Sequence, residues 1–332
     1  MAGFTPSIKR LGNSEQDQLR LGVARAKEGR LDEALSAFET AAQINPESVP
    51  AHMAAGNLLF RQRRYDEALL HYQSVMKLDP LIAIAPLKAG SICLRQQNLD
   101  SALNFFENAL NLDPQSTNAT FAYVGMGQVY LKREQYDAAV QQFRKALRLN
   151  PQMMMGRMML ASAYKRQGQL DAAIAELEAV QAADTQIPSS YLQLGSIYLE
   201  QRNYGKAKAA FQAALKLDPK IPLIKTSIKF GLAEALIQEN ELQEAAKILR
   251  VLPETKLYAP KKHQLFGDLY SRQGLSKEAA EEYRAAALLG SSGGMVPDEL
   301  ANLEELENQE SWDDLVESYR LSANAVLQGA RS

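Results

Sequence analysis

A period of 34 residues constrains the fold of this chain more than any other feature. Short segments that end in proline recur along it: Ile44-Asn45-Pro46, Leu78-Asp79-Pro80, Leu112-Asp113-Pro114, Leu149-Asn150-Pro151 and Leu217-Asp218-Pro219. Successive prolines are separated by 34, 34, 37 and 68 residues. Such a period predicts an array of similar units that stack on their neighbours, because one unit of this size cannot bury its apolar face alone.

Two helices fit into each period. Apolar residues recur at helical spacing over residues 16–28, and a second helical pattern runs from residue 31 to about residue 44. Gly29 lies in the break between them, and Gly168 and Gly274 occupy the same place in later units. Glycine adopts the left-handed conformation that ends many helices. We therefore expect a helix, a tight turn and a second helix in each unit.

Four packing positions recur in every unit. The first helix contains a small residue: Gly22, Gly56, Gly90, Gly127, Ala161, Gly195, Ala233 and Gly267. Twelve residues later there is always an alanine: Ala34, Ala68, Ala102, Ala139, Ala173, Ala207, Ala245 and Ala279. Four residues further there is a bulky residue: Phe38, Tyr72, Phe106, Phe143, Leu177, Phe211, Leu249 and Tyr283. Seven residues after the alanine there is a small or aliphatic residue: Ala41, Val75, Ala109, Ala146, Val180, Ala214, Leu252 and Ala286.

On these residues the sequence is similar to the tetratricopeptide repeat family, in which a small residue of a first helix faces a bulky residue of a second. The resemblance implies an all-α, right-handed solenoid superhelix of about eight helix-turn-helix repeats with a C-terminal capping segment. We expect an N-terminal extension over residues 1–14, the solenoid over residues 15–291, and a flexible link with a degenerate ninth repeat or cap over residues 292–332. The repeats begin near residues 15, 49, 83, 120, 154, 188, 226 and 260, with insertions of 3 and 4 residues after repeats three and six.

Composition excludes several classes of protein. Lys and Arg number 37 against 39 Asp and Glu, and this balance argues against a general nucleic-acid binder, which needs surplus cations. The single cysteine, Cys93, excludes a disulfide framework, and its place in a first helix predicts a buried, inert thiol. No apolar run approaches 18 residues, so we expect no membrane span. Without a secretory signal the chain is expected to be cytoplasmic as written, or peripheral to a membrane if a signal or anchor was removed.

The sequence offers poor candidates for catalysis. It contains neither a phosphate-binding Walker loop nor a Gly-x-Gly-x-x-Gly turn after a strand. His52, His71 and His263 lack the partners at metal-ligand spacing that a zinc site requires. The methionines between Met153 and Met159 are expected to line a surface or pack rather than bind copper. We therefore predict no enzymatic activity, no cofactor and no metal site.

In the family, the first helix of each repeat lines a concave groove that binds a partner. The resemblance places these residues in the partner-binding groove: Met53, Asn57, Phe60, Arg61, Leu87, Ser91, Arg95, Phe121, Val124, Gln128, Lys132, Met155, Met158, Ser162 and Arg166. The apolar ones extend a lane that also includes Leu19, Val23, Leu94 and Leu131. The uncharged polar ones, Asn57, Ser91, Gln128 and Ser162, form a polar ladder that continues to Ser196. The alternative, that several apolar members pack between helices, stays open.

A second recurring feature is a cation in the last turn of the first helix. Its members in five consecutive repeats are Lys27, Arg61, Arg95, Lys132 and Arg166. They either complement the negative end of the helix or attract an acidic partner. The carboxylate clamp of chaperone-binding family members, with a Lys and an Asn in the first repeat, is not expected, because Leu19 and Val23 stand there.

The resemblance favours a non-enzymatic adaptor that holds an extended peptide or amphipathic helix of another protein in its groove and assists assembly of a multi-protein complex. The repeats are similar to those of bacterial members of the family. Two alternatives remain open at this point. One is a scaffold that self-associates head to tail through residues 296–332, which contain nine acidic and two basic residues. The other is a regulatory subunit of an enzyme on another chain.

Overall fold

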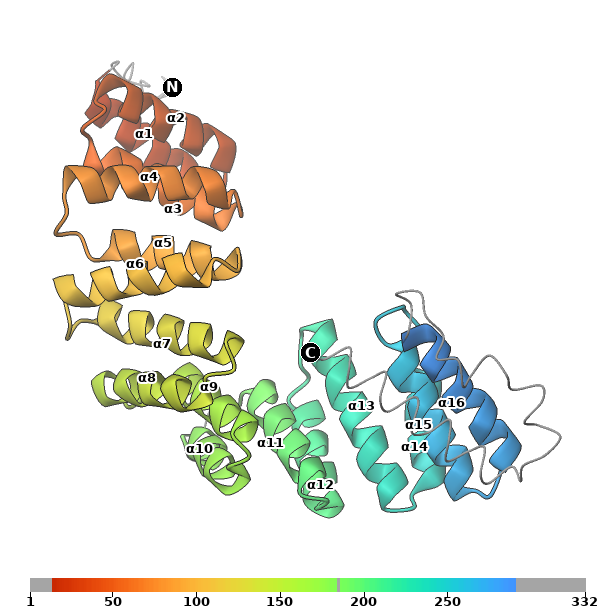
Figure 1. Ribbon diagram of the computed structural model, residues 1–332. Helices are drawn as coiled ribbons and strands as arrows, with labels where there is room; N and C mark the ends of the chain where they lie inside the picture. Colours follow the sequence, from red (N-terminus) through yellow and green to blue (C-terminus); the bar gives the residue numbers. More distant parts are fainter. Residues whose placement is uncertain (1–13, 184–185, 291–332) are drawn as a thin grey trace, which may run out of the picture. The chain divides into compact units, whose positions relative to one another are not determined.

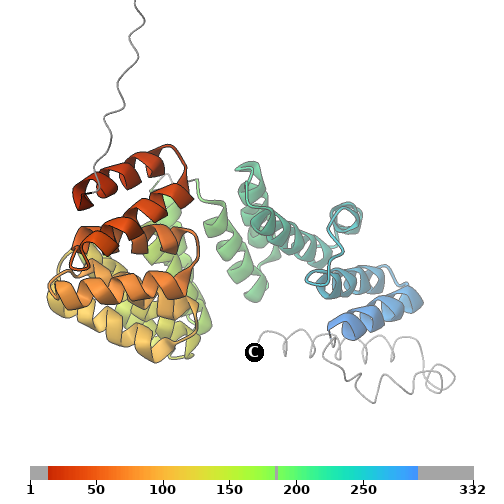
Figure 2. The ribbon, with the colours of Figure 1, turned by 90° about the horizontal axis from the view of Figure 1, so that it is seen from above.

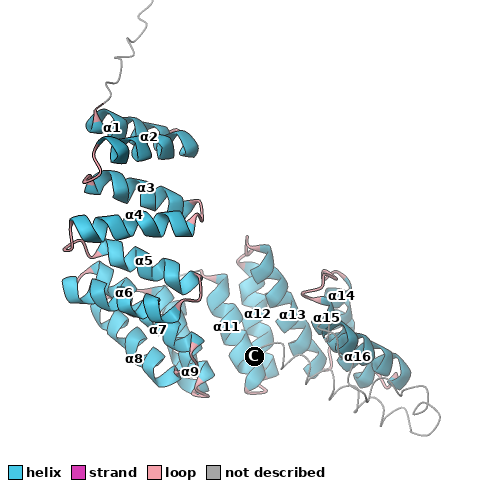
Figure 3. Cartoon of the chain, turned by 45° about the horizontal axis from the view of Figure 1, so that its top comes forward, coloured by secondary structure: helices cyan, strands magenta, loops and turns pink. Residues whose placement is uncertain are grey.

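The computed structural model describes residues 14–183 and 186–290, and there it consists of sixteen α-helices joined by short turns, with no strand (Figures 1 and 3). The predicted all-α class is therefore confirmed. The expectations for an N-terminal extension before residue 14 and for a C-terminal link and cap lie outside the described residues. The chain divides into two compact units, Met1–Gln167 and Gly168–Ser332, which we describe separately.

The helices alternate between the first and the second helix of each repeat, here called the A helix and the B helix. In the first unit they are α1 (Glu15–Lys27), α2 (Leu31–Ile44), α3 (Val49–Arg61), α4 (Tyr65–Leu78), α5 (Ile84–Arg95), α6 (Leu99–Leu112), α7 (Thr117–Lys132), α8 (Tyr136–Leu149) and α9 (Met154–Arg166). In the second unit they are α10 (Leu170–Ala182), α11 (Pro188–Glu200), α12 (Tyr204–Lys216), α13 (Pro222–Gln238), α14 (Leu242–Arg250), α15 (Ala259–Arg272) and α16 (Ser276–Gly290). Odd-numbered helices are A helices, and in each unit consecutive helices pack against one another (Figure 2).

The turn from A helix to B helix has the same backbone geometry in every repeat. The second of its three residues is left-handed, with φ of +78° at Gly29, +79° at Gly168 and +74° at Gly274. At the same register the other five repeats place a residue with a side chain in this conformation: Arg63, Gln97, Glu134, Arg202 and Asn240. The following N–H closes the helix, as from Arg64 to the Leu59 carbonyl at 3.0 Å. The predicted glycine turns are confirmed.

The bulky residue of the B helix packs against the glycine of the A helix in its own repeat where one is present, and in repeats three and six it also packs against a glycine of the next A helix. A Cβ atom added to Gly127 would lie 2.5 Å from Cε1 of Phe143, in the same repeat. Phe106 also reaches the next A helix, where a Cβ atom on Gly125 would lie 2.3 Å from its Cζ. Side chains at these glycines would force the helices apart. The predicted pattern of small and bulky positions is therefore the contact that holds A and B helices together.

The core of both units is built from the predicted packing positions. Residues at all four positions are buried in every repeat, and the eight alanines of the B helices are 0% exposed. Leu177 and Leu249, which replace the aromatic residue, are also 0% exposed. Cys93 is buried as predicted, and burial raises the pKa of its thiol. At the predicted core positions the structure agrees with the sequence pattern.

Consecutive repeats are joined by a recurring hydrogen bond at the end of the A helix. A glutamine after its last turn donates to an aspartate in the first turn of the preceding B helix. These pairs are Gln62 with Asp32 (3.0 Å), Gln96 with Asp66 (2.7 Å), Gln167 with Asp137, and Gln201 with Asp171 (3.0 Å). In repeat four Arg133 takes the place of the glutamine and forms an ion pair with Asp100. The same polar contact therefore recurs between consecutive repeats.

Two inserted segments lengthen A helices. Helices α7 and α13 contain 16 and 17 residues, against 12 to 14 in the other A helices, and both extensions lie at their N-terminal ends. Helix α14, in contrast, has only nine residues and ends two residues before Leu252. Leu252 precedes Pro253, and a residue before proline disfavours the helical conformation. Its side chain is still buried, so the packing position survives the early end of the helix.

Candidate functional site

The A helices of repeats two to five differ from the B helices in charge. Helices α3, α5, α7 and α9 contain no Asp or Glu, and together they contain seven Lys and Arg residues. In the first unit, each B helix has acidic residues in its first turn, and α2, α4, α6 and α8 together contain eight carboxylates. The carboxylates and many of the cations of the first unit are thus separated onto different sets of helices.

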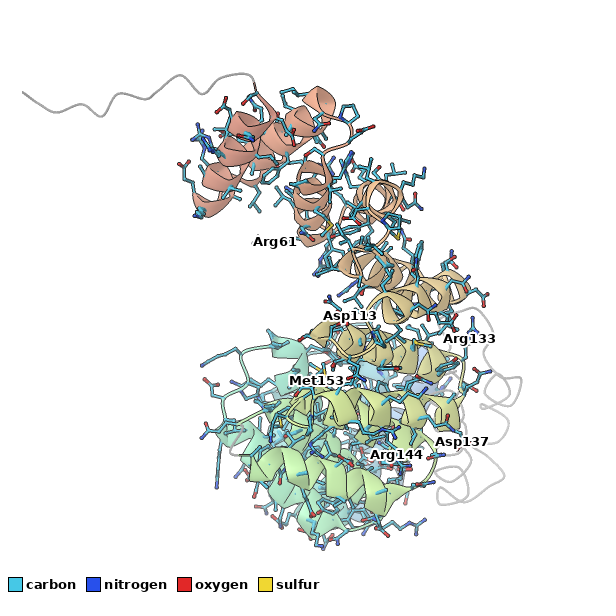
Figure 4. All side chains as sticks on the ribbon, turned by 90° about the vertical axis from the view of Figure 1, so that its left-hand side faces the viewer. Arg61, Asp113, Arg133, Asp137, Arg144 and Met153 are labelled. Carbon is cyan, nitrogen blue, oxygen red and sulfur yellow. The ribbon has the colours of Figure 1, made fainter. Side chains whose placement is uncertain are left out.

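The last-turn cations of the first unit, here called the basic stripe, are Lys27, Arg61, Arg95, Lys132 and Arg166. All five are exposed, and no ion pair joins any of them to a carboxylate of the described residues. Two cations in the adjoining turns are paired: Arg30 lies 2.6 Å from Glu33, and Arg64 lies 2.5 Å from Glu67. Figure 4 labels Arg61 of the stripe at the end of α3 and Arg133, paired with Asp100, just after α7.

Arg95 of the stripe is held against two aromatic rings. Its guanidinium carbon lies 5.8 Å from the ring centre of Phe60 and 5.9 Å from that of Tyr65. Lys88 lies seven residues before Arg95, and its Nζ lies 5.3 Å from the centre of the same Phe60 ring. Contact with a ring restrains a guanidinium but leaves its N–H donors available. Two cations and two aromatic residues therefore form one cluster, which α5, α3 and the start of α4 build together.

The structure divides the predicted apolar lane into exposed and buried members. Val23, Phe121 and Met155 are exposed, at 48, 49 and 54%. The partly buried members are Leu19, Met53, Phe60 and Leu131. The buried members are Leu87, Leu94, Val124 and Met158, none more than 8% exposed. Their assignment to an accessible groove is corrected accordingly, because these side chains pack in the core, where Leu87 and Leu94 join a cluster around Phe106.

The polar ladder is largely engaged within the protein. Asn57 is exposed, but its Oδ1 accepts a hydrogen bond from the hydroxyl of Tyr72 at 2.9 Å. Ser91 donates to the Leu87 carbonyl at 2.9 Å, and the Gln128 amide lies 3.8 Å from a methionine sulfur in the next A helix. Ser162 is half-buried. Asn57 therefore supports the packing of a buried tyrosine, a role the sequence did not predict.

The histidines take part in contacts that the sequence did not predict. Nδ1 of His52 lies 2.9 Å from Nδ1 of His71 on the paired B helix, and Nδ1 of His263 lies 2.6 Å from Oε2 of Glu282. Burial lowers the pKa of His71, and the nearby His52 lowers it further. Among the described residues, no three His, Cys, Asp or Glu side chains come together as metal ligands would.

Two features of the A helices were not predicted from the sequence. Lys88 was not singled out, although its spacing of seven residues from Arg95 places both on one side of a helix. The absence of carboxylates from four A helices was also visible in the sequence. Across residues 14–183 and 186–290, no helix has both the length and the apolar character needed to cross a bilayer.

Comparison with known proteins gives a family and a fold. Models of the tetratricopeptide repeat match residues 25–90, 81–152, 124–187 and 198–257. A chain of the APC/C hetero-tetramer Cut9–Hcn1 is similar in structure, with a TM-score of 0.60 and 17% identity, over 94% of this chain and 57% of that one. A tetratricopeptide repeat protein from Parabacteroides merdae gives a TM-score of 0.53 and 21% identity, over 66% of this chain and 84% of that one. PilF from Pseudomonas aeruginosa gives a TM-score of 0.53 and 17% identity, over 69% of this chain and 96% of that one. No curated protein sequence matches the chain.

Proposed function

The chain belongs to the tetratricopeptide repeat family, and on this premise we propose that it is a non-enzymatic adaptor that binds a segment of another protein across the A helices of its first unit. The observation that carries this proposal is the charge of those helices: α3, α5, α7 and α9 contain no carboxylate, and the five cations of the basic stripe are exposed and form no ion pair with the described carboxylates. Three exposed apolar side chains, Val23, Phe121 and Met155, lie on three of the same five A helices, α1, α7 and α9.

Such a combination is typical of a surface that binds protein. Binding surfaces are enriched in aromatic residues, methionine and arginine, which bury area and form directional hydrogen bonds. Methionine also adapts to several side-chain shapes because its chain is flexible. Within the first unit the B helices contain carboxylates as well as cations, and Glu33, Glu67 and Asp100 of these helices are paired with cations.

We further propose that the adaptor contributes to assembly of a multi-protein complex. A repeat array presents an extended surface in which each repeat adds its own contacts. The similar chain from the APC/C hetero-tetramer belongs to a multi-protein assembly, and this is consistent with such a role. The identity of the partner is a matter for experiment.

Site-specific photo-crosslinking tests the proposed surface and recovers the partner. A photoreactive phenylalanine analogue placed at Phe121 or Met155 of the full chain should yield a discrete crosslinked product in cells. The matched control is Leu70, which is 65% exposed on the B helix α4. Crosslinks of equal yield from position 70, or none from positions 121 and 155, would contradict the proposed surface.

A further inference from the structure

We infer that the segment bound by the A helices of the first unit is acidic and extended, and that the basic stripe recognises carboxylates spaced along it. This inference rests on the proposed function and adds the chemistry of the partner. It requires that the stripe be free to bind, that it serve more than helix stability, and that its spacing fit a peptide.

The stripe is free to bind an anion. Its five cations are exposed and form no ion pair with the described carboxylates, whereas Arg30, Arg64 and Arg133 in the adjoining turns are all paired. The four A helices α3, α5, α7 and α9 contain no carboxylate that would compete with a ligand. An acidic segment therefore meets uncompensated positive charge along this surface, and electrostatic complementarity of this kind directs association.

Helix stability alone does not account for the stripe. A cation near the C-terminus of any helix interacts favourably with the helix dipole. If this effect alone explained the stripe, the B helices would share it uniformly. In the first unit all five A helices have a cation in the last turn, whereas α4 and α8 have one and α2 and α6 have none. The unbroken row on the A helices is what a ligand that crosses those helices would require.

The spacing of the stripe fits an extended chain. Where successive A helices contact each other directly, as α5 with α7 and α7 with α9, their axes are expected about 8–10 Å apart, and an extended chain advances about 3.3 Å per residue. A segment that crosses successive A helices therefore meets a new cation about every third residue. Carboxylates at this spacing would each face one cation, whereas a helical segment rises only about 1.5 Å per residue and would need carboxylates about six residues apart.

The aromatic cluster prepares one cation of the stripe for binding. Phe60 and Tyr65 hold the guanidinium of Arg95 without neutralising it, because a ring offers no formal charge. A restrained guanidinium loses less freedom when it binds a carboxylate. Arg95 is therefore expected to contribute more to recognition of the acidic segment than the lysines Lys27 and Lys132.

A peptide titration with the full chain tests the inference. The probe is a fluorescein-labelled peptide of about 15 residues, with Glu at every third position and Leu or Phe between, which is long enough to pass five A helices. The control probe replaces each Glu with Gln. The stripe variant changes Arg61, Arg95 and Arg166 to Gln, and the control variant changes Arg30, Arg64 and Arg133 to Gln, which removes the same charge. Each exposed pair is worth about 1.4- to 5-fold in affinity, so the stripe variant should bind the Glu probe about tenfold more weakly.

Three results would overturn the inference. The first is equal affinity of the Glu and Gln probes for the unaltered protein, or no binding of the Glu probe at low salt. The second is an equal loss of affinity for the Glu probe in the stripe and control variants, which would indicate attraction by net charge rather than recognition by the stripe. If crosslinking from Phe121 still captures a partner in either case, the proposed function stands and only the acidic chemistry is wrong. The third is self-association at low salt that the stripe variant abolishes, measured by light scattering, which would assign the surface to residues 296–332 of a second copy.

Discussion

At the scale of single residues, the helix pairs depend on glycines that allow close approach. At Gly127 an added Cβ atom would lie 2.5 Å from Phe143, whereas at Gly56 it would lie 3.1 Å from Tyr72. Contacts below 3.0 Å force a neighbour to move, and those slightly above it are relieved by small shifts. The same small-residue position therefore tolerates change differently from one repeat to the next.

Replacing Gly127 and Gly56 by alanine, each in a separate variant, compares the close contact with the looser one. The gain in helix propensity, about 1 kcal/mol, is common to both substitutions. The difference between Gly127→Ala and Gly56→Ala should therefore reflect the clash with Phe143, about 1–3 kcal/mol of unfolding free energy. Denaturant unfolding followed by circular dichroism measures it. Equal midpoints for the two variants would show that the rings move aside without cost.

The left-handed residue of the turn offers a second single-residue test. Gln97 has φ of +63°, a conformation that costs a residue with a side chain about 1–2 kcal/mol. Gln97→Gly should raise the midpoint of thermal unfolding, and Gly29→Ala, at φ of +78°, should lower it. No atom lies within 4 Å of a Cβ added at Gly29, so strain alone would act there. Calorimetry that finds both variants shifted in the same direction would rule out this explanation.

The half-buried side chain of His71 makes stability depend on pH. Burial and His52 lower the pKa of His71 below about 6.5, the value of an unperturbed histidine. The unfolded chain therefore takes up a proton at this side chain before the folded chain does. Stability is fully present above about pH 6.5 and is lost as the pH falls through the folded pKa. His71→Gln should make the midpoint of thermal unfolding depend less on pH between about pH 7 and 5. An unchanged pH dependence in this variant would exclude His71 as its source.

At the scale of helices, a Gln–Asp hydrogen bond recurs between neighbouring repeats. Gln96, just after α5, and Asp66 of α4 are joined at 2.7 Å on an exposed part of the surface. A hydrogen bond to a charged group contributes more than one between neutral groups, but exposure reduces it. Each bond therefore contributes little to the free energy of unfolding, and any larger effect comes from the sum over several repeats.

A double-mutant cycle measures one such bond. Gln96→Ala, Asp66→Ala and the double variant should give a coupling of about 0.5–1 kcal/mol in unfolding free energy. The single variants should each lower the urea midpoint slightly. A coupling of zero would mean that the bond only reports a register which apolar packing has already set.

Much of the helical architecture was predictable because it repeats. Alanines such as Ala34 and aromatic residues such as Phe106 recur at fixed intervals, and the periodicity alone indicates that they face a core. Burial of Leu87 and Met158 was not predictable in this way. Their register places them beside other helices, and a pattern read from single helices does not say which neighbours cover them. The role of Asn57 was missed for the same reason, since its partner Tyr72 lies on another helix.

At the scale of the whole molecule, the chain contains two compact units, and the candidate surface lies entirely in the first. In repeat arrays the stability is close to a sum of terms for single repeats and for contacts between neighbours. Exposed side chains on the A helices contribute little to these terms. Substituting them is therefore expected to change stability little.

The central claim is that a partner binds across the A helices of the first unit, and affinity measurements on two matched variants test it most directly. Phe121→Ser removes a 49% exposed side chain from α7, and Leu70→Ser removes a 65% exposed side chain from α4. Neither should change the thermal midpoint by much, because both side chains are exposed. Isothermal titration with the partner recovered by crosslinking should show at least about tenfold weaker binding for Phe121→Ser and no change for Leu70→Ser. Unchanged affinity for Phe121→Ser, or an equal loss for Leu70→Ser, would contradict the claim.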